Sequence, residues 1–179
     1  MHSSARTALL ATTLILAGTL SAMAQETPAW EVAGGYSSIR WDDETFHGWL
    51  LSGAKHLTST LAITGEVGGN YTTYELFDVS KGVHSFMVGP RLSVSGNAIA
   101  TPFVQVLVGG ARFHVEDAVL GYSDSSTGFA LQPGAGVDVQ MRPNVGLRLG
   151  VDYRRTSLND ESVGQFRFHV GVVLRGGTR

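Results

Sequence analysis

Over most of this chain apolar residues occupy every second position, and this alternation restricts the fold more than any other feature. The pattern is clearest in the stretch QFRFHVGVVLR, residues 165–175, where five apolar residues alternate with polar, charged or small ones. Successive side chains of a β-strand point to opposite faces, so the spacing predicts a strand with one apolar and one polar face. The question it raises is which of the two faces lies inside the fold.

Eight runs of this kind follow one another, and only short connections separate them. They cover residues 30–41, 47–57, 61–74, 84–95, 101–116, 127–142, 145–155 and 165–175. Strands joined only by hairpins form an up-and-down antiparallel sheet, and closure into a barrel removes both exposed edges. The connections after the odd-numbered runs are longer and acidic, while the others are short. The sequence therefore predicts an all-β fold, an eight-stranded antiparallel up-and-down transmembrane β-barrel of the bacterial outer-membrane type.

Three positions disturb the regular alternation. In the fifth run, Val104 to Val108 are out of phase with Ala111 and Phe113, so we expect a β-bulge at the Gly109–Gly110 pair between them. Pro90 and Pro133 lie inside predicted strands, where proline has no N–H to donate. At each proline we expect a bulge or a skipped hydrogen bond.

The first 24 residues have the features of a secretory signal peptide. One positive charge at Arg6 precedes the apolar run TALLATTLILAGTL, and small residues follow at Ala22 and Ala24, as a signal peptidase requires. We therefore predict a signal peptide over residues 1–24 and one barrel domain over residues 25–179. An N-terminal membrane anchor is the alternative, although the apolar run is short for one.

The bulk composition excludes several classes of function. The formal net charge is −2, which gives no field that would attract nucleic acid. The sequence has no cysteine, so disulfides, thiolate metal sites and thiol nucleophiles are excluded. His47, His114 and His169 lack the spacing of metal ligands, and we expect neither a metal nor a cofactor.

Two kinds of barrel fit these strands, and the polar faces distinguish them. In a secreted soluble barrel that binds an apolar ligand, the polar face would meet water and carry many long charged residues. The polar faces here are mostly Gly, Ser, Ala and Thr, with single charged residues among them. An arginine on the lipid face at the bilayer midplane would cost about 2–4 kcal/mol. We therefore predict that Phe166 to Leu174 face lipid, that Arg167, His169 and Arg175 face inward, and that Lys55 reaches the interface from the lipid face.

The inward charges fall into pairs on neighbouring strands. The predicted pairs are Glu66 with Arg91, Asp138 with Arg148, and Asp152 with Arg167, and His169 shares their face. An eight-stranded barrel has just enough interior for side chains to fill, and isolated charges there would be costly. We interpret these residues as a network that plugs the lumen, with a narrow low-conductance pore as the alternative.

The longer connections carry a second charged group, which predicts an acidic outer rim. Its members are Asp42, Asp43, Glu44, Glu116, Asp117, Asp160 and Glu161. A solvated loop surface is the simplest interpretation, and divalent-cation bridges to lipopolysaccharide phosphates are an additional possibility.

A lipid A-modifying enzyme is the alternative from another class of function. Such enzymes need a serine, a histidine and an acid at one rim of the barrel. His114 lies near Glu116, but no serine shares that strand end, and the adjacent His84 and Ser85 face opposite sides. We therefore predict no catalytic residues and no enzymatic activity.

The stretches AGGYSSIR, HGWLLSGAKHL, GEVGGNY, VGPRLS, TPFVQVLVGGARF and VDYRRT resemble the small outer-membrane β-barrel family, the OmpA-like transmembrane domains. The resemblance covers residues 25–179. It implies a Gram-negative outer-membrane location and a structural or surface-interaction role in envelope integrity or adhesion. The implied partners are outer-membrane lipid and lipopolysaccharide, the outer-membrane assembly machinery and an external surface ligand, and we expect a monomer.

Overall fold

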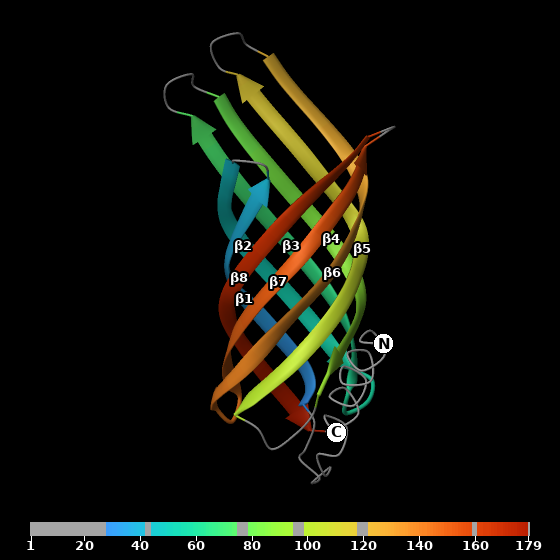
Figure 1. The fold of residues 1–179 in the computed structure, drawn as a ribbon. Helices are drawn as coiled ribbons and strands as arrows, with labels where there is room; N and C mark the ends of the chain where they lie inside the picture. The colour runs from blue at the N-terminus through green and yellow to red at the C-terminus, as the bar shows by residue number, and fades with distance from the viewer. Residues whose placement is uncertain are drawn as a thin grey trace, which may run out of the picture.

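The computed structural model describes residues 28–41, 44–74, 79–94, 99–117, 122–158 and 161–178, and they form one closed barrel (Figure 1). Each strand pairs antiparallel with its neighbours in sequence, and β1 pairs with β8 to close the barrel. The predicted eight-stranded up-and-down barrel is confirmed. The strands are β1 (Pro28–Trp41), β2 (Glu44–His56), β3 (Leu61–Tyr74), β4 (Val79–Ser93), β5 (Ala100–Asp117), β6 (Tyr122–Arg142), β7 (Val145–Leu158) and β8 (Glu161–Thr178).

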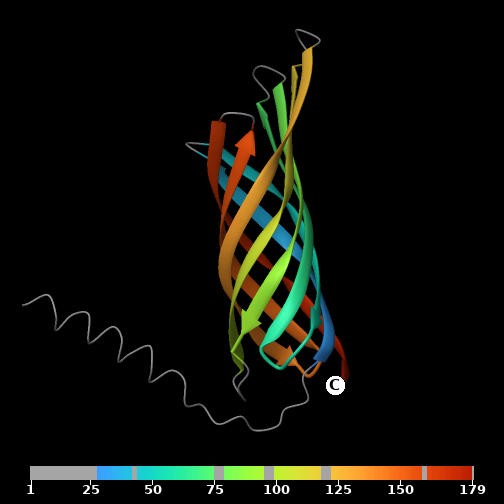
Figure 2. The same ribbon diagram turned by 90° about the vertical axis from the view of Figure 1, so that its right-hand side faces the viewer.

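The barrel is a narrow tube with two unlike ends. In Figures 1 and 2 the start of β1 and the end of β8 lie at the lower end, while β5 and β6 extend furthest at the upper end. Two short turns close hairpins at the lower end. In one, Thr58 Oγ1 accepts hydrogen bonds from the backbone N–H groups of Thr60 (3.2 Å) and Leu61 (3.0 Å). Within the described residues, no helix is long and apolar enough to span a membrane.

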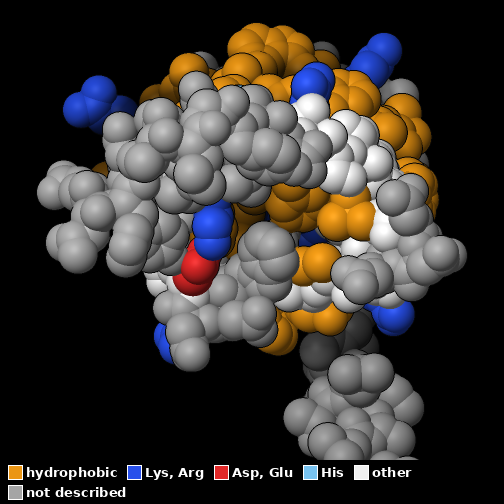
Figure 3. Space-filling view, turned by 90° about the horizontal axis from the view of Figure 1, so that it is seen from above, with side chains coloured by type: hydrophobic (Ala, Val, Ile, Leu, Met, Phe, Trp, Pro, Cys, Tyr) orange, Lys and Arg blue, Asp and Glu red, His pale blue; other side chains and the backbone are white. Residues whose placement is uncertain are grey.

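The apolar faces of the strands point outward and the polar faces point inward. Phe166 on β8 is 54% exposed, whereas its neighbour Arg167 is only 1% exposed. His169 is buried as well, and Arg175 lies half-buried at the lower end, so the predicted orientation of β8 is correct. Seen from above (Figure 3), hydrophobic side chains cover the outer wall along the top and right of the view. Outward-facing aromatic residues are Trp30, Tyr36, Trp49, Tyr71, Phe86, Phe129, Tyr153, Phe166 and Phe168.

The β-bulge predicted at Gly109–Gly110 is wrong. β5 keeps one unbroken register with β6 and with the upper half of β4 through both glycines. The alternation breaks in the sequence because the lumen lining changes from polar to apolar, while the backbone stays regular. Inward-facing Leu107 and Ala111 of β5 pack with Met87 and Ala130 in a buried apolar cluster, against which Phe113 also packs. Figure 3 accordingly shows hydrophobic side chains inside the mouth of the barrel.

Both prolines interrupt the strand pairing, as predicted. The β4–β5 pairing skips Gly89 and Pro90, and the β6–β7 pairing skips Gln132 and Pro133, with the same register on either side of each gap. The register shifts instead at Met141, next to the β6–β7 turn. Lys55 is exposed on the outer face near the lower end, as expected.

Candidate functional site

The lower half of the lumen contains a group of buried ion pairs, which we call the lower cluster. Its members are Glu31, Arg91, Asp138, Arg148 and Arg175. The Glu31 carboxylate accepts hydrogen bonds from Arg91 and from Arg148 (2.7 Å). Arg148 also binds both oxygens of Asp138, at 2.7 and 2.8 Å, and Arg175 donates to Asp138 at 2.5 Å. Each carboxylate therefore binds two guanidinium groups from different strands.

A second group of buried charges, the upper cluster, lies closer to the upper end. Its members are Glu66, Gln132, Asp152, Arg154 and Arg167. Arg167 binds Asp152 at 2.6 Å and Glu66 at 2.8 Å. The Gln132 amide donates to Glu66 (3.0 Å) and accepts from Arg154 (2.8 Å). All five side chains are almost completely buried.

Gln105 on β5 joins the two clusters into one network. Its amide oxygen accepts from the guanidinium of Arg91 at 2.8 and 3.0 Å, and its amide nitrogen donates to Asp152 at 3.1 Å. The buried network therefore extends along the lumen from Glu31 to Glu66. The residues named so far come from seven strands, and His56 of the remaining strand, β2, lies 3.6 Å from Glu31.

The small residues on the inner face provide the space that these long side chains need. A Cβ on Gly134 would lie 1.8 Å from Oδ1 of Asp152, so no larger residue fits there without moving the carboxylate. The ring of Phe103 packs against two guanidinium groups, with centroid distances of 4.6 Å to Arg91 and 5.0 Å to Arg148. Cation–π contacts of this kind are favourable where water is excluded.

The two clusters combine four carboxylates with five guanidinium groups, so most of the buried charge is compensated within the lumen. Charges in a low-dielectric interior are tolerated only when they are paired and hydrogen-bonded. This arrangement has the chemistry of a filled polar core. The carboxylates are Glu31, Glu66, Asp138 and Asp152, and the guanidinium groups belong to Arg91, Arg148, Arg154, Arg167 and Arg175.

The structure brings together two of the three predicted ion pairs, Asp138 with Arg148 and Asp152 with Arg167. The predicted pair of Glu66 with Arg91 is wrong. Strand register places Glu66 opposite Met87 and Arg91 opposite Ala62, so the two charges lie at different levels of the lumen. His169 lies 3.4 Å from Asp152, at the edge of the upper cluster.

Glu31 was not among the predicted network residues, although its carboxylate binds two arginines, Arg91 and Arg148. Its contacts cross the lumen to β4 and β7, which are not neighbours of β1. The available signal was local, because Glu31 alternates with the outward-facing Trp30 and Val32. Arg154, Gln105 and Gln132 also face inward, because they too alternate with outward-facing residues along their strands.

Most of the predicted acidic rim lies outside the described side chains. Asp42, Asp43 and Asp160 are outside the described residues, and Glu116, Asp117 and Glu161 are described only as backbone at the upper strand ends. Glu44 is described, and it binds Lys81 of β4 at 2.9 and 3.1 Å. Its charge at the mouth of the barrel is therefore already compensated.

The histidines form no metal centre with their described neighbours. Among the described side chains no group of three or more metal-binding residues could hold an ion. His47 and His84 face outward, where His47 stacks on Tyr36 with its ring hydrogen-bonded to the tyrosine hydroxyl, and His84 packs edge-on against Tyr71.

Comparisons with known proteins agree with this architecture. A family model described as outer membrane protein beta-barrel domain matches residues 10–175. The fold is similar to Neisserial surface protein A, with 15% identity, a TM-score of 0.65, and 82% of this chain and 95% of that chain covered. No curated protein sequence matches the chain.

Two further solved barrels have the same fold. Ail, the attachment invasion locus protein of Yersinia pestis, is 18% identical with a TM-score of 0.56, and the match covers 83% of this chain and 99% of that one. The N-terminal β-barrel domain of Pseudomonas aeruginosa OprF is 14% identical with a TM-score of 0.57, covering 84% and 99%. At these identities the similarity concerns the fold alone.

Proposed function

Because this chain belongs to the outer membrane protein beta-barrel domain family and is a protein of the Gram-negative outer membrane, we propose that it is a non-enzymatic barrel with a structural or surface-interaction role, whose lumen is closed. In this proposal the barrel wall anchors the protein in the membrane, and the upper end of the barrel faces the exterior. The charged lumen stabilises the barrel and transports nothing.

The observation that carries the closed lumen is the continuous network of buried ion pairs. Arg148 and Arg167 each bind two carboxylates, and both guanidinium groups are at most 3% exposed. A water-filled path along the lumen would leave these groups in contact with solvent. Beside the upper cluster, Met87 and Leu107 of the apolar cluster are the register partners of Glu66 and Gln132, and they offer no hydrogen bonds to a passing ion.

The non-enzymatic part of the proposal concerns two places among the described residues where a serine and a histidine are register partners near an acid. The expectation that no serine shares the strand end of His114 is wrong, because Ser125 of β6 lies opposite His114 and Ser123 opposite Glu116. The Ser125 hydroxyl accepts a hydrogen bond from Arg112 at 3.1 Å.

The second place is inside the lumen. Ser37 is paired in register with His169, and His169 lies near Asp152. The Ser37 hydroxyl, however, donates to the side chain of Asn70 (3.3 Å), and all three residues are buried in the lumen. A lipid substrate has no access to such a serine, and Asp152 is already bound to Arg167.

The surface-interaction part draws on the related barrels and on the shape of the upper end. One structure of Ail contains the heparin analogue sucrose octasulfate, so a barrel of this fold binds an external ligand. Here the β3–β4 and β5–β6 hairpins carry the barrel wall beyond the other strands, and β5 and β6 reach furthest (Figures 1 and 2). The proposed partners are an external surface ligand, lipopolysaccharide and outer-membrane lipid, and the assembly machinery that inserts the barrel, with a monomer as the functional unit.

Cells with and without the gene test this role. We expect loss of the protein to increase sensitivity to detergents or to reduce attachment to a surface, with restoration by a plasmid copy. Lipid A from the same cells should have an unchanged mass spectrum. A change in lipid A acyl chains on expression would overturn the non-enzymatic assignment. Unchanged detergent sensitivity and attachment would overturn the structural or surface role.

A further inference from the structure

Three of the described arginine side chains face outward near the upper end of the barrel. They belong to β1, β5 and β7. Among the described side chains no carboxylate faces outward beside them, because Glu31, Glu66, Asp138 and Asp152 are buried in the lumen and Glu44 binds Lys81. In Figure 3 several Lys and Arg side chains project from the outside of the wall. The three residues are Arg40, Arg112 and Arg155.

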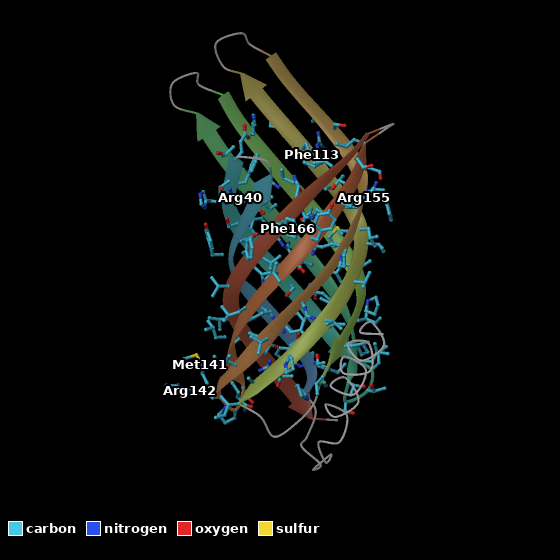
Figure 4. All side chains as sticks on the ribbon, viewed as in Figure 1. Arg40, Phe113, Met141, Arg142, Arg155 and Phe166 are labelled. Carbon is cyan, nitrogen blue, oxygen red and sulfur yellow. The ribbon has the colours of Figure 1, made fainter. Side chains whose placement is uncertain are left out.

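Two of these residues, Arg40 and Arg155, flank a single strand. Strand register places Arg155 of β7 opposite Gly164 of β8 and Arg40 of β1 opposite Phe166, so β8 runs between the two arginines. Figure 4 shows Arg40 and Arg155 at similar height on either side of Phe166. Both side chains are exposed, and we call them the β8 arginine pair.

Between the arginines the surface offers hydroxyl groups. Gly164 has no side chain, and the ring of Tyr153 lies over it, with the tyrosine hydroxyl 2.4 Å from where a Cβ would stand. A larger residue at position 164 would displace that hydroxyl. Arg155 donates to the hydroxyl of Ser162 at 3.3 Å, an exposed contact with a neutral group, and no carboxylate among the described side chains pairs with Arg155. The surface therefore presents two guanidinium groups and two hydroxyl groups around one glycine.

The height of this surface relative to the aromatic belt indicates what faces it. Tyr153 and Phe166 pack together with ring centroids 5.0 Å apart, directly below Gly164 and next to Arg40 in register. Aromatic girdles mark the boundary between hydrocarbon and polar headgroups in outer-membrane barrels. Residues just beyond the girdle at the upper end therefore lie at the level of the headgroups in the outer leaflet.

We propose that the β8 arginine pair, with the hydroxyl groups of Tyr153 and Ser162, binds a phosphate group of the lipid A headgroup of lipopolysaccharide. Guanidinium groups bind phosphate oxygens through charge-assisted and often bidentate hydrogen bonds, and hydroxyl groups can donate to the remaining oxygens. The acyl chains of the same molecule would lie along the exposed rings of Phe166 and Phe168. The contact is direct, and needs no divalent cation.

The opposite end of the barrel provides a matched control. Arg142 is also exposed and basic, but it lies at the lower end beside the β6–β7 turn (Figure 4), at the other membrane surface. The arginine across one strand from it, Arg175 of β8, is half-buried and binds Asp138 in the lumen, so Arg142 has no outward-facing arginine partner there. A general attraction between any exposed arginine and an anionic lipid would involve Arg142 as much as Arg40 or Arg155.

Native mass spectrometry of the whole mature protein in detergent micelles tests the proposal, with bisphosphorylated lipid A and its dephosphorylated form as the probes. We expect the unmutated protein to prefer the bisphosphorylated lipid. Each of the single variants Arg40→Gln and Arg155→Gln should weaken that binding about fivefold, because a basic residue near an anionic membrane surface contributes about 1 kcal/mol to binding. The double variant should weaken it roughly twenty-fivefold if the two contributions add. Arg142→Gln should bind as the unmutated protein does, and a double lysine variant should retain part of the preference. Heat-modifiable migration in gels verifies that each variant is folded.

Four results would overturn the proposal. These are equal binding of the two lipids by the unmutated protein, an undiminished preference in the Arg40→Gln/Arg155→Gln double variant, or complete displacement of the lipid by an equal concentration of inorganic phosphate. The fourth is loss of binding to a sulfated glycan in the double variant with lipid A binding intact, which would assign the surface to an external ligand. The inference rests on the outer-membrane location within the proposed function and does not depend on the closed lumen. Failure of lipid A binding and ion conduction through the lumen are therefore separate outcomes.

Discussion

Replacement of Glu31 by glutamine is the perturbation that most severely tests the buried network. In the native lumen Glu31 binds Arg91 and Arg148, and it lies 3.6 Å from His56 and 3.8 Å from Arg175. The substitution keeps the size of the side chain but leaves Asp138 as the one carboxylate for three arginines in the lower cluster. Removing one partner of a buried ion pair costs about 3–5 kcal/mol, and Glu31 is only 5% exposed.

The control for Glu31→Gln is Glu44→Gln. Glu44 forms an ion pair with Lys81 in which both side chains are about one-third exposed, and such pairs contribute about 0–1 kcal/mol. Urea titration of the protein in lipid vesicles, followed by the fluorescence of its three tryptophans, measures both free energies of unfolding. We expect a large loss for Glu31→Gln and a small one for Glu44→Gln. A loss below about 1 kcal/mol for Glu31→Gln would refute the reasoning, because it would mean that water already solvates the lower cluster.

Two further predictions use the same assay. Asp138→Ala and Arg148→Ala together should destabilise the barrel by less than the sum of the single changes, since the double variant removes both members of the pair; additive losses would contradict a direct interaction. Leu107→Ala should cost about 2–5 kcal/mol because it leaves a cavity in the apolar cluster, whereas Val106→Ala, next to it on the lipid face, should cost much less because lipid fills the space. Equal losses at the two positions would contradict the assigned faces.

Sequence alternation predicts the strands and their orientation well because each strand meets lipid on one side along its whole length. The period of two in residues 165–175 alone assigns Phe166 outward and Arg167 inward, as the structure has them. The prediction failed at Gly109–Gly110, where the inner face itself becomes apolar and the pattern loses its meaning. Alternation reports a difference between two faces, and it is uninformative where both are apolar.

The ion pairs were only partly predictable, because a side chain in a narrow lumen reaches beyond its neighbouring strands. Asp138 and Arg148 are register partners on adjacent strands, so their pairing follows from the hairpin between them. Glu31 and Arg91 lie on β1 and β4, and their contact depends on the stagger of the whole closed barrel. No local pattern in the sequence records that stagger.

The β8 arginine pair at the upper end was missed for a different reason. From the sequence, an interaction with lipopolysaccharide was expected at the acidic loops, where charged residues are close together along the chain. Arg40 and Arg155 are 115 positions apart by number, and only the closure of β8 against β1 brings them to the same surface. Barrel closure is a long-range property that spacing along the chain does not reveal.

Ion conductance through the purified protein in a planar bilayer tests the central claim most directly, namely that the charged side chains close the lumen. The account predicts almost no current from the unmutated protein, and a small leak after Arg148→Ala, which removes a guanidinium group bound to both Glu31 and Asp138. Steady, ion-selective channels of high open probability from the unmutated protein would contradict it, because the network from Glu31 to Glu66 would then line a water-filled path.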